Sequence, residues 1–375
     1  MNILYIITKL ELGGAQKVCL DLARHFNKKN NVYLISSLEG QLNKEAEKLL
    51  GENFIKNPYL VRKISPLKDL KAFNFIRKFI ENNDIDLVHT HSSKAGVLGR
   101  VAAHLNNIDK VIHTIHGFAF NDFKNPLINQ IYKNIERYTA HLADYLIAVT
   151  NMDIKKGLEN NIGKKEQYRL VRAAADVDYF VNYKNEDEKI REKYNIEEDS
   201  FIVTQMSCFK KQKNPLDFVK IAKKLKDRVD KKTYFFLVGD GKLGKKIKRK
   251  ISEFGLEENV ILTGWEDDVR PFISVSDVFT LTSLWEGLPI AIIEAHLLKK
   301  PVVVTKVDGN QEIVRNGING FLYTPGNIDN AVEKLEILYH NQDLGKKMGN
   351  LGYEKVIEEF SKDKMLKDTE AIYYD

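Results

Sequence analysis

The sequence has few of the features that mark disulfide-rich, membrane-spanning or low-complexity proteins. Its only two cysteines, Cys19 and Cys208, lie far apart and in different expected elements, which favours reduced thiols in the cytosol over a disulfide framework. No apolar run approaches the roughly 18–20 residues that a membrane-spanning helix needs, and no internal repeat or low-complexity tract occurs. The opening MNILYIITKL is too short for a signal peptide and lacks its basic start, so a strand is expected there.

What is present is the composition of an ordinary globular protein of 375 residues, a length that suits two domains. Residues 1–180 hold 26 Lys and Arg against 19 Asp and Glu, whereas residues 181–375 hold 32 against 33. The basic excess of the first half would suit an anionic partner such as a membrane leaflet or a nucleic acid, or it is an ordinary solvated face. A nucleic-acid partner is not expected, because the basic residues lack interleaved aromatic stacking platforms.

Short apolar runs alternate with longer segments of helical period along the chain. Runs of this kind suit parallel strands that are buried on both faces, and their alternation with helices indicates βαβ units. The expected strands are ILYIIT, NVYLIS, DLVHTH, KVIHTIHG and DYLIAVT in the first half, and FIVTQMS, TYFFLVGD, NVILTG, DVFTLTS and PVVVTK in the second.

The alternation pauses near Ala174, where small residues give way to dense charge, and then restarts. The pattern therefore predicts an α/β fold with two Rossmann-like, doubly wound domains, residues 1–174 and 175–358. Residues 359–375 form one more predicted helix, which is expected to return to the first domain. Its apolar positions are Met365, Leu366, Ile372 and Tyr373. Because ligands bind at the carboxyl ends of such strands, two sheets side by side would face each other across a cleft.

Two glycine-rich loops follow expected strands. Gly13 and Gly14 come after the first strand, where free helix N–H groups can hold phosphate, although a tight turn is the simpler explanation. The sequence GDGKLG, which starts at Gly239, fits the dinucleotide fingerprint poorly, because Asp240 stands where pyrophosphate would lie and no acid ends the next strand. No nicotinamide cofactor is therefore expected, and a turn that lines another nucleotide is left open.

Three lysines, Lys210, Lys211 and Lys213, lie where the strand FIVTQMS gives way to a helix. That position is the expected place for phosphate contacts in a doubly wound sheet. The competing interpretation is a solvated loop, which three lysines in four residues commonly form.

Four histidines lie in two expected strands, His89 and His91 in LVHTH, and His113 and His116 in KVIHTIHGF. His89 and His91 should point to one face of the sheet, because side chains alternate along a strand. The cluster suggests zinc, but no cysteine or carboxylate completes a recognisable ligand spacing, so no metal site is predicted. His116 stands at the end of its strand, which makes it a candidate site residue.

Two acids bracket the start of a predicted helix in LWEGLPIAIIEA. Pro289 suits the first helical position, so the helix is expected to run from about Leu288 to Leu298. Glu286 then lies in the loop before the helix and Glu294 inside it. The N–H groups at such a helix start attract anions, and a carboxylate in the loop is suited to accept hydrogen bonds from sugar hydroxyls.

The surrounding segment, SLWEGLPIAIIEAHLLKKPVVVTKVDGNQEIVRNGINGFL, resembles the C-terminal signature of retaining glycosyltransferases of family 4, which share the GT-B fold. The likeness extends over nearly the whole chain, through the Gly-Gly loop, HTHSSKAGVLGR, HTIHGF, GDGKL, NVILTG and the final helix. These motifs are highly specific together and weak singly. The resemblance implies a nucleotide sugar held mainly by the second domain, no metal or other cofactor, and retention of configuration without a protein nucleophile.

The resemblance also implies how the second domain holds the donor. Glu286 would bind hydroxyls of the donor sugar, and Glu294 would bind the ribose. The amides of Gly287 and Leu288 would reach the diphosphate, and Lys213 matches the family's diphosphate lysine.

In the first domain, Gly14 matches the family's phosphate-contacting glycine, and His116 matches the histidine that reaches the donor sugar near the reacting carbon. The expected catalytic residues are therefore His116, Lys213 and Glu286. The expected nucleotide-sugar-binding residues are Gly14, Lys210, Lys211, Gly239, Gly264, Gly287, Leu288 and Glu294.

Three positions depart from the family's pattern. Cys208 stands in place of the arginine that helps to neutralise the leaving diphosphate, and Lys210 or Lys211 would have to supply that charge as a point charge. Lys299 replaces the glycine usual before PVV, and Asp308 stands where a Gly-Gly pair usually begins.

We therefore expect a transferase that moves a hexose or N-acetylhexosamine from a nucleotide diphosphate sugar, with UDP as the expected nucleotide. The expected acceptor is a polyprenyl diphosphate-linked glycan in bacterial surface-polysaccharide assembly. Two alternatives are a GT-B-like UDP-sugar epimerase that needs no acceptor, and a nucleotide-sugar-binding module without catalysis.

Membrane contact is expected from the segment Ser65 to Asn83, which has helical period and basic residues away from its apolar side. A basic amphipathic helix can lie on an anionic membrane, or it packs in the core with its lysines solvated. The expected location is the cytoplasm, at the inner face of the cell membrane. The apolar positions of this helix are Leu67, Leu70, Phe73, Ile76 and Ile80.

Overall fold

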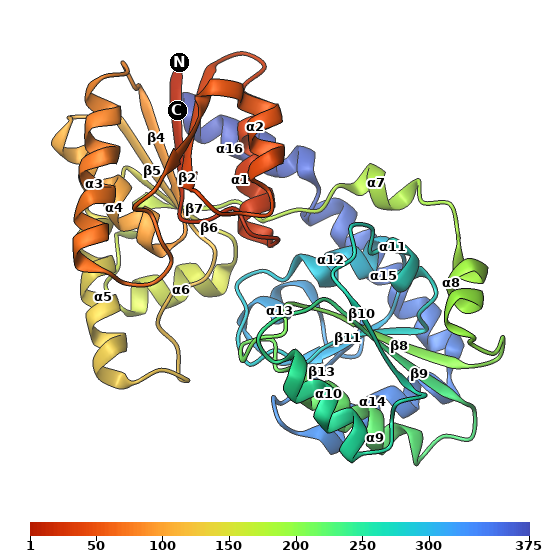
Figure 1. Ribbon diagram of the computed structural model, residues 1–375. Coiled ribbons are helices and arrows are strands. Elements are labelled where there is room, and N and C mark those ends of the chain that lie inside the picture. Colours follow the sequence, from red (N-terminus) through yellow and green to blue (C-terminus); the bar gives the residue numbers. More distant parts are fainter. The chain divides into compact units, whose positions relative to one another are not determined.

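The computed structural model describes residues 1–375, and the chain divides into two compact units (Figure 1). Unit 1 comprises Met1–Ala173 together with Asp363–Asp375, and unit 2 comprises Ala174–Lys362. Each unit contains one parallel sheet flanked by helices, which confirms the predicted α/β fold class with two doubly wound domains.

The sheet of unit 1 has seven parallel strands in the order β3-β2-β1-β4-β5-β6-β7. The strands are β1 (Asn2–Ile7), β2 (Asn31–Ser37), β3 (Phe54–Asn57), β4 (Leu87–His91), β5 (Lys110–Ile115), β6 (Tyr145–Ala148) and β7 (Tyr168–Leu170). The helices are α1 (Gly14–Phe26), α2 (Asn43–Leu50), α3 (Pro66–Glu81), α4 (Ser93–Leu105), α5 (Pro126–Ala140), α6 (Asn151–Glu159) and α16 (Lys362–Tyr374), with the short 3-10 turns η1 (Gly51–Asn53) and η2 (Lys165–Gln167).

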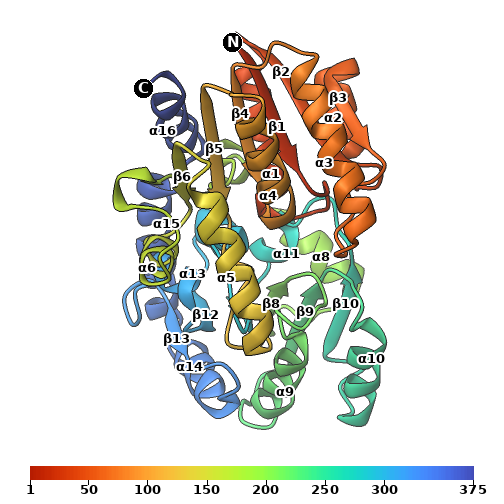
Figure 2. The same ribbon diagram turned by 90° about the vertical axis from the view of Figure 1, so that its left-hand side faces the viewer.

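Helices cover both faces of this sheet, with α1, α2 and α16 on one face and α3, α4 and α5 on the other (Figures 1 and 2). Side chains alternate along β1 accordingly. Leu4 and Ile6 join the apolar core beneath α3 and α4, whereas Tyr5 faces α16. The Tyr5 hydroxyl accepts a hydrogen bond of 2.9 Å from Tyr373 of that helix.

The last helix, α16, buries the apolar positions that its sequence predicts. Met365, Leu366, Ile372 and Tyr373 are all buried. The ring of Tyr373 stacks on Phe26 of α1, with 4.4 Å between the ring centres. Residues from the far end of the sequence therefore complete the face of the unit 1 sheet that α1 begins.

The sheet of unit 2 has six parallel strands in the order β10-β9-β8-β11-β12-β13. The strands are β8 (Phe201–Met206), β9 (Thr233–Val238), β10 (Val260–Gly264), β11 (Val278–Leu281), β12 (Val302–Thr305) and β13 (Phe321–Tyr323). The helices are α7 (Val177–Val181), α8 (Asp187–Tyr194), α9 (Pro215–Lys226), α10 (Gly244–Glu253), α11 (Arg270–Ser274), α12 (Ile290–Leu297), α13 (Asp308–Ile313), α14 (Ile328–His340) and α15 (Gln342–Glu359).

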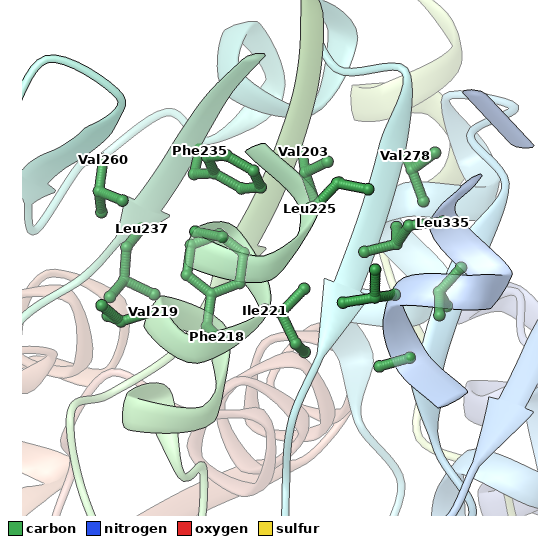
Figure 3. Close-up of a cluster of buried hydrophobic side chains, with 14 of the residues drawn as sticks. Val203, Phe218, Val219, Ile221, Leu225, Phe235, Leu237, Val260, Val278 and Leu335 are labelled. Atoms are coloured by element: carbon green, nitrogen blue, oxygen red, sulfur yellow. The ribbon is translucent and has the colours of Figure 1, made fainter. Parts of the chain in front are cut away.

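The main apolar core of unit 2 lies between its sheet and α9 (Figure 3). Phe218 and Ile221 of α9 pack against side chains of the central strands, among them Phe235 and Leu237 of β9. This layer is fully buried and fixes where α9 begins, directly after the loop that follows β8.

Strand order reverses once in each sheet, and this reversal positions the candidate site. In unit 1 the reversal falls between β1 and β4, and in unit 2 between β8 and β11. The loops that leave two such strands diverge to opposite faces, which opens a crevice at the carboxyl edge of the sheet. The loops after β1 and β4, and those after β8 and β11, therefore lie where sheets of this kind bind ligands.

Helix α3 is mainly a core-packed helix. Its residues Ala72, Ile76 and Ile80 are buried, whereas Leu67 and Leu70 in its first turns are 78% and 57% exposed. The predicted apolar side of this helix is thus divided between core and solvent. No helix of the structure has a stretch both long enough and apolar enough to cross a membrane.

Candidate functional site

The reversal of strand order in unit 2 brings a lysine and a carboxylate together. Lys213 lies in the loop after β8, and Glu286 lies in the loop after β11. Lys213 Nζ is 2.6 Å from Glu286 Oε1. The side chains of Lys213 and Glu286 are only 18% and 5% exposed, so the ion pair is largely screened from water.

Neighbouring polar groups fix the Glu286 carboxylate. The Ser283 hydroxyl donates a short hydrogen bond to Oε1, and Gln212 Nε2 approaches Oε2 at 3.4 Å. Gln212 also donates to the carbonyl of Trp285 at 2.9 Å, which ties the two loops together. These contacts give the carboxylate a defined orientation.

Helix α12 follows this loop and is shorter than its sequence predicts. It runs from Ile290 to Leu297, and Pro289 is its N-cap residue rather than its first helical residue. Pro289 has the extended backbone of a cap, with φ of −78° and ψ of 102°. The expected span of about Leu288 to Leu298 is wrong by one or two residues at each end.

Glu294 lies within α12 and is 7% exposed. It lies near Tyr179 of α7. Burial raises the pKa of Tyr179, and the negative charges of Asp268 and Glu294 add to that rise. The predicted ribose ligand is thus on the helix itself, one turn beyond the loop that holds Glu286.

Gly309, at the start of α13, touches the same loop. A Cβ atom at Gly309 would overlap the carbonyl oxygen of Gly287. The segment with the predicted Gly287 and Leu288 amides therefore packs closely against the first turn of α13, directly before α12 begins. The absence of a side chain at Gly309 is what permits this approach.

The remaining predicted residues of unit 2 lie along the same carboxyl edge of the sheet. The Gly239 N–H donates to the Gly264 carbonyl at 2.8 Å, which links the loops after β9 and β10. Gly239 has φ of +125°, and a Cβ atom there would overlap the backbone of Ser207. The loop that carries Lys210 and Lys211 thus packs on a glycine turn.

In unit 1, a cavity of about 190 Å³ opens at the carboxyl ends of the central strands. His116 lies on its wall, and so does Ala15, the residue after Gly14. Ser92 on the wall has φ of +64°, an unusual value for a residue with a side chain, and its hydroxyl bonds to Thr8 at 2.8 Å. Strain of this kind is common where a backbone is shaped for a ligand.

The four histidines fall into two groups. His89, His91 and His116 lie on the α16 side of the sheet, whereas His113 lies under α4 and bonds to Thr90 at 2.9 Å. The rings of His89 and His91 are 4.3 Å apart, which confirms that they share one face. His91 Nδ1 is 3.0 Å from His116 Nε2.

These histidines are held neutral by their surroundings. Burial lowers the pKa of His116 to about 4. Burial and the nearby His116 together lower the pKa of His89 to about 3. Burial and the neighbouring histidines also lower the pKa of His91 well below its usual value. Near neutral pH each ring therefore carries one proton and acts as a hydrogen-bond donor at one nitrogen only.

Asp-x-Asp occurs twice in the sequence, and in each place the structure gives one of the two acids a local role. Asp86 accepts a hydrogen bond of 2.7 Å from the Asn2 N–H, and Asp176 caps α7 by accepting from Tyr179 at 3.1 Å. No three His, Cys, Asp or Glu side chains are grouped as metal ligands would be.

The structure thus brings the predicted residues of unit 2 to one edge of its sheet, and those of unit 1 to another. Sequence reasoning missed the groups that orient them. Ser283 and Gln212 support Glu286, and His91 supports His116. The signal was present for two of them, since Ser283 lies three residues before Glu286 in the same loop and Gln212 adjoins Lys213.

Two family models match the chain. The model described as Glycosyltransferase Family 4 matches residues 12–178, and the model described as Glycosyl transferases group 1 matches residues 186–355. The first match lies almost entirely in unit 1 and the second lies within unit 2. Together they cover most of both units.

Two curated relatives illustrate the likeness. The chain is 32% identical to a UDP-Gal:alpha-D-GlcNAc-diphosphoundecaprenol alpha-1,3-galactosyltransferase of Escherichia coli, over 86% of this chain and 84% of that protein. It is 25% identical to an N-acetyl-alpha-D-glucosaminyl L-malate synthase of Bacillus anthracis, over 97% of this chain and 94% of that protein.

Among solved structures, that of HepE of Anabaena in complex with UDP and glucose superposes with a TM-score of 0.86 and 19% sequence identity. The superposition covers 100% of this chain and 99% of the HepE chain. At that identity the overlap shows a common fold and nothing more specific.

Proposed function

The chain belongs to glycosyltransferase family 4 and has the GT-B fold, and on that basis we propose that it is a retaining enzyme that uses a UDP-sugar and a lipid-linked acceptor. The transferred group would be a hexose or an N-acetylhexosamine. The observation that carries the proposal is the Lys213–Glu286 pair at the strand-order reversal of unit 2, since a doubly wound sheet binds ligands there.

In the proposed donor complex, Lys213 contacts the diphosphate and Glu286 accepts hydrogen bonds from sugar hydroxyls. A carboxylate fixed by Ser283 and Gln212 is well prepared for the second role, because its orientation needs no rearrangement. The ion pair keeps the Lys213 ammonium beside the sugar site, where an incoming diphosphate would compete for it. The amides of Gly287 and Leu288 would add hydrogen bonds to the phosphate oxygens, and Glu294 would hold the ribose.

The reaction breaks the bond between the sugar and the diphosphate, so negative charge grows on the leaving group. Lys213 and preorganised N–H groups stabilise that charge, with Lys210 and Lys211 as further cations in the place of the family's arginine. We propose that these cations make a metal ion unnecessary. The acceptor hydroxyl oxygen then bonds to the sugar carbon on the face that the diphosphate leaves, and the hydroxyl proton passes to the departing diphosphate. The configuration is thereby retained without a protein nucleophile.

Two residues of unit 1 stay in the proposal. His116, on the wall of the unit 1 cavity, is proposed to reach the donor sugar near the reacting carbon. Gly14, at the start of α1, is proposed to contact phosphate through its backbone.

The acceptor is proposed to be a polyprenyl diphosphate-linked glycan, since the Escherichia coli relative is named for a GlcNAc-diphosphoundecaprenol substrate. The enzyme would work in the cytoplasm, in peripheral contact with the inner face of the cell membrane. The Bacillus anthracis relative is named for a small, water-soluble acceptor, L-malate, so the acceptor has to be tested directly.

The test is a screen of UDP-sugars by thermal shift, followed by mass spectrometry of the products formed with GlcNAc-diphospho-polyprenol or with L-malate. We expect one UDP-hexose or UDP-N-acetylhexosamine to stabilise the protein, and UDP to be released only when the polyprenyl acceptor is present. UDP release with malate alone would refute the lipid-linked acceptor. Conversion of the UDP-sugar without any acceptor would favour an epimerase.

The residue roles are tested by Lys213→Ala and Glu286→Ala, each expected to lower kcat about 100-fold or more while circular dichroism stays unchanged. The matched control is Lys224→Ala, which removes another lysine–carboxylate pair of unit 2, Lys224 with Asp329, where both side chains are about half exposed. This control should keep full activity. Near-wild-type turnover in both site variants would contradict the assigned roles.

A further inference from the structure

Helix α5 turns a row of large apolar side chains toward solvent. Leu127, Ile128, Ile131, Ile135 and Tyr138, which we call the α5 apolar face, are 77%, 46%, 57%, 39% and 68% exposed. Their spacing of one, three and four residues places them on one side of the helix. The surface helices α9, α10 and α15 of unit 2 expose no large apolar side chain.

The orientation of α5 is fixed by its other side, so the exposure is not that of a loosely packed helix. Glu136, Thr139 and Ala140 are buried against the rest of unit 1. Glu136 forms an ion pair of 2.8 Å with Arg100 of α4, and Arg100 is fully buried. Rotation of α5 to bury its apolar face would break this pair and leave a charge without its partner, which is strongly unfavourable.

Basic side chains outnumber acidic ones around α5. Lys133 and Arg137 lie on the helix, and Lys124 lies just before it, near the exposed Asp122. On the neighbouring α6, Lys155 pairs with Glu159 at 3.8 Å, and these side chains are 66% and 61% exposed. The only acid within α5 is Glu136, whose charge is buried and paired with Arg100. The helix itself therefore carries two cations and no exposed carboxylate.

We infer that the α5 apolar face inserts into the surface of an anionic lipid bilayer. A helix that lies in the interface buries its apolar side at the headgroup–acyl boundary while its lysines and arginines meet anionic headgroups. This inference deepens the proposed function, because it names the surface through which the enzyme reaches a lipid-linked acceptor. It also replaces α3 as the main membrane contact, since Ile76 and Ile80 of α3 are used in the core.

The test is flotation with vesicles of phosphatidylglycerol and phosphatidylcholine, compared with phosphatidylcholine alone. The wild-type protein should float with the anionic vesicles, and less so as salt concentration rises. Leu127→Glu/Ile131→Glu should lower the bound fraction about tenfold or more, because two apolar groups are lost and two like charges face the lipid.

The matched control is Leu67→Glu/Leu70→Glu, which makes the same change of charge at two exposed leucines of α3. This variant should keep most of its flotation. Loss of flotation in the α3 variant but not in the α5 variant would overturn the inference, and so would failure of the wild-type protein to float. A wild-type dimer in sedimentation velocity that the α5 variant dissociates would assign the face to a second copy of this chain instead.

The result can be separated from the fate of the proposed function. With a short-chain acceptor that is soluble in water, the α5 variant should transfer sugar as fast as the wild type, while transfer to acceptor in vesicles should fall with the bound fraction. If no acceptor is glycosylated at all, the proposed function fails, and the flotation comparison still decides the role of α5.

Discussion

His91 and His116 share one hydrogen bond, and the surroundings of the other ring nitrogen of His91, Nε2, indicate which ring donates it. His91 is fully buried, and its Nε2 atom has no hydrogen-bond partner. If His116 donated the shared proton, His91 would carry its own proton on Nε2 as a buried donor without an acceptor. Buried N–H groups without partners are rarer than buried acceptors without partners, so His91 is the better donor through Nδ1.

The consequence for His116 is a fixed tautomer. With Nε2 accepting from His91, the single proton of the neutral His116 ring lies on Nδ1, which becomes its hydrogen-bond donor. His91 is therefore a positioning residue for the proposed site, and it acts through His116.

This role predicts different outcomes for two substitutions of His91. Asparagine can place its Nδ2 donor where Nδ1 of histidine lies, so His91→Asn should keep most of the activity. His91→Leu removes the donor and should lower kcat about tenfold. Steady-state kinetics with the donor identified by the screen provide the measurement. Equal loss in the two variants, with both folded by circular dichroism, would show that His91 only fills space.

At the level of elements, the sequence predicted the central strands of both sheets and missed three of the four edge strands. The expected runs correspond to β1, β2, β4, β5 and β6 in unit 1 and to β8–β12 in unit 2. The three strands that were missed, β3, β7 and β13, have three or four residues and lie at sheet edges. Each of these strands pairs with a single neighbour, so its formation depends on the strand already beside it.

Helix boundaries and exposure depended on partners that the sequence does not display. Pro289 is the N-cap of α12, and the loop before it lies in close contact with Gly309 of α13. The buried side chains of α3 join the same core as those of α4, whereas Leu67 and Leu70 in the first turns of α3 are exposed. Apolar spacing identified α3 as a helix but could not show where its neighbour ends.

The contact of α13 with the Glu286 loop predicts a strong effect of a single methyl group. Gly309→Ala would force the α13 start away from Gly287, which should displace the proposed diphosphate amides and lower kcat/KM about tenfold or more. The matched change is Gly345→Ala inside α15, where the nearest atom to the new Cβ is 3.5 Å away. That variant should be fully active and slightly more stable, since alanine favours a helix by about 1 kcal/mol over glycine.

Kinetics and urea unfolding of both variants provide the measurement. An active Gly309→Ala enzyme with unchanged KM would show that the loop does not depend on this contact.

At the level of the whole molecule, buried histidines in both units make stability depend on pH. Burial lowers the pKa of His116 to about 4 in unit 1 and that of His296 to about 4 in unit 2. In the unfolded chain these groups bind a proton near pH 6.5. Between pH 6.5 and about 4 the unfolded state therefore binds more protons, and the folded state loses stability as pH falls.

The free energy of unfolding should accordingly be nearly constant above pH 7 and decrease by about 1.4 kcal/mol per pH unit for each such histidine below pH 6. Urea unfolding in buffers from about pH 8 to about pH 5, in steps of about one pH unit, provides the measurement. His141→Ala, at an exposed histidine, should leave the profile unchanged. Stability that stays flat or rises on acidification to pH 5 would contradict neutral buried histidines in the folded state.

The discontinuity of unit 1 has a consequence for how the protein is made. Its sheet and α1 come from Met1–Ala173, but the cover over Tyr5 and His89 comes from α16, after all of unit 2. A ribosome that adds roughly 5–20 residues per second needs on the order of ten seconds or more to synthesise unit 2. During that interval one face of the unit 1 sheet lacks its cover, α16. Unit 2, in contrast, is a single continuous segment of the chain. The unit that is synthesised first therefore cannot complete its native fold until the last helix of the chain has been made.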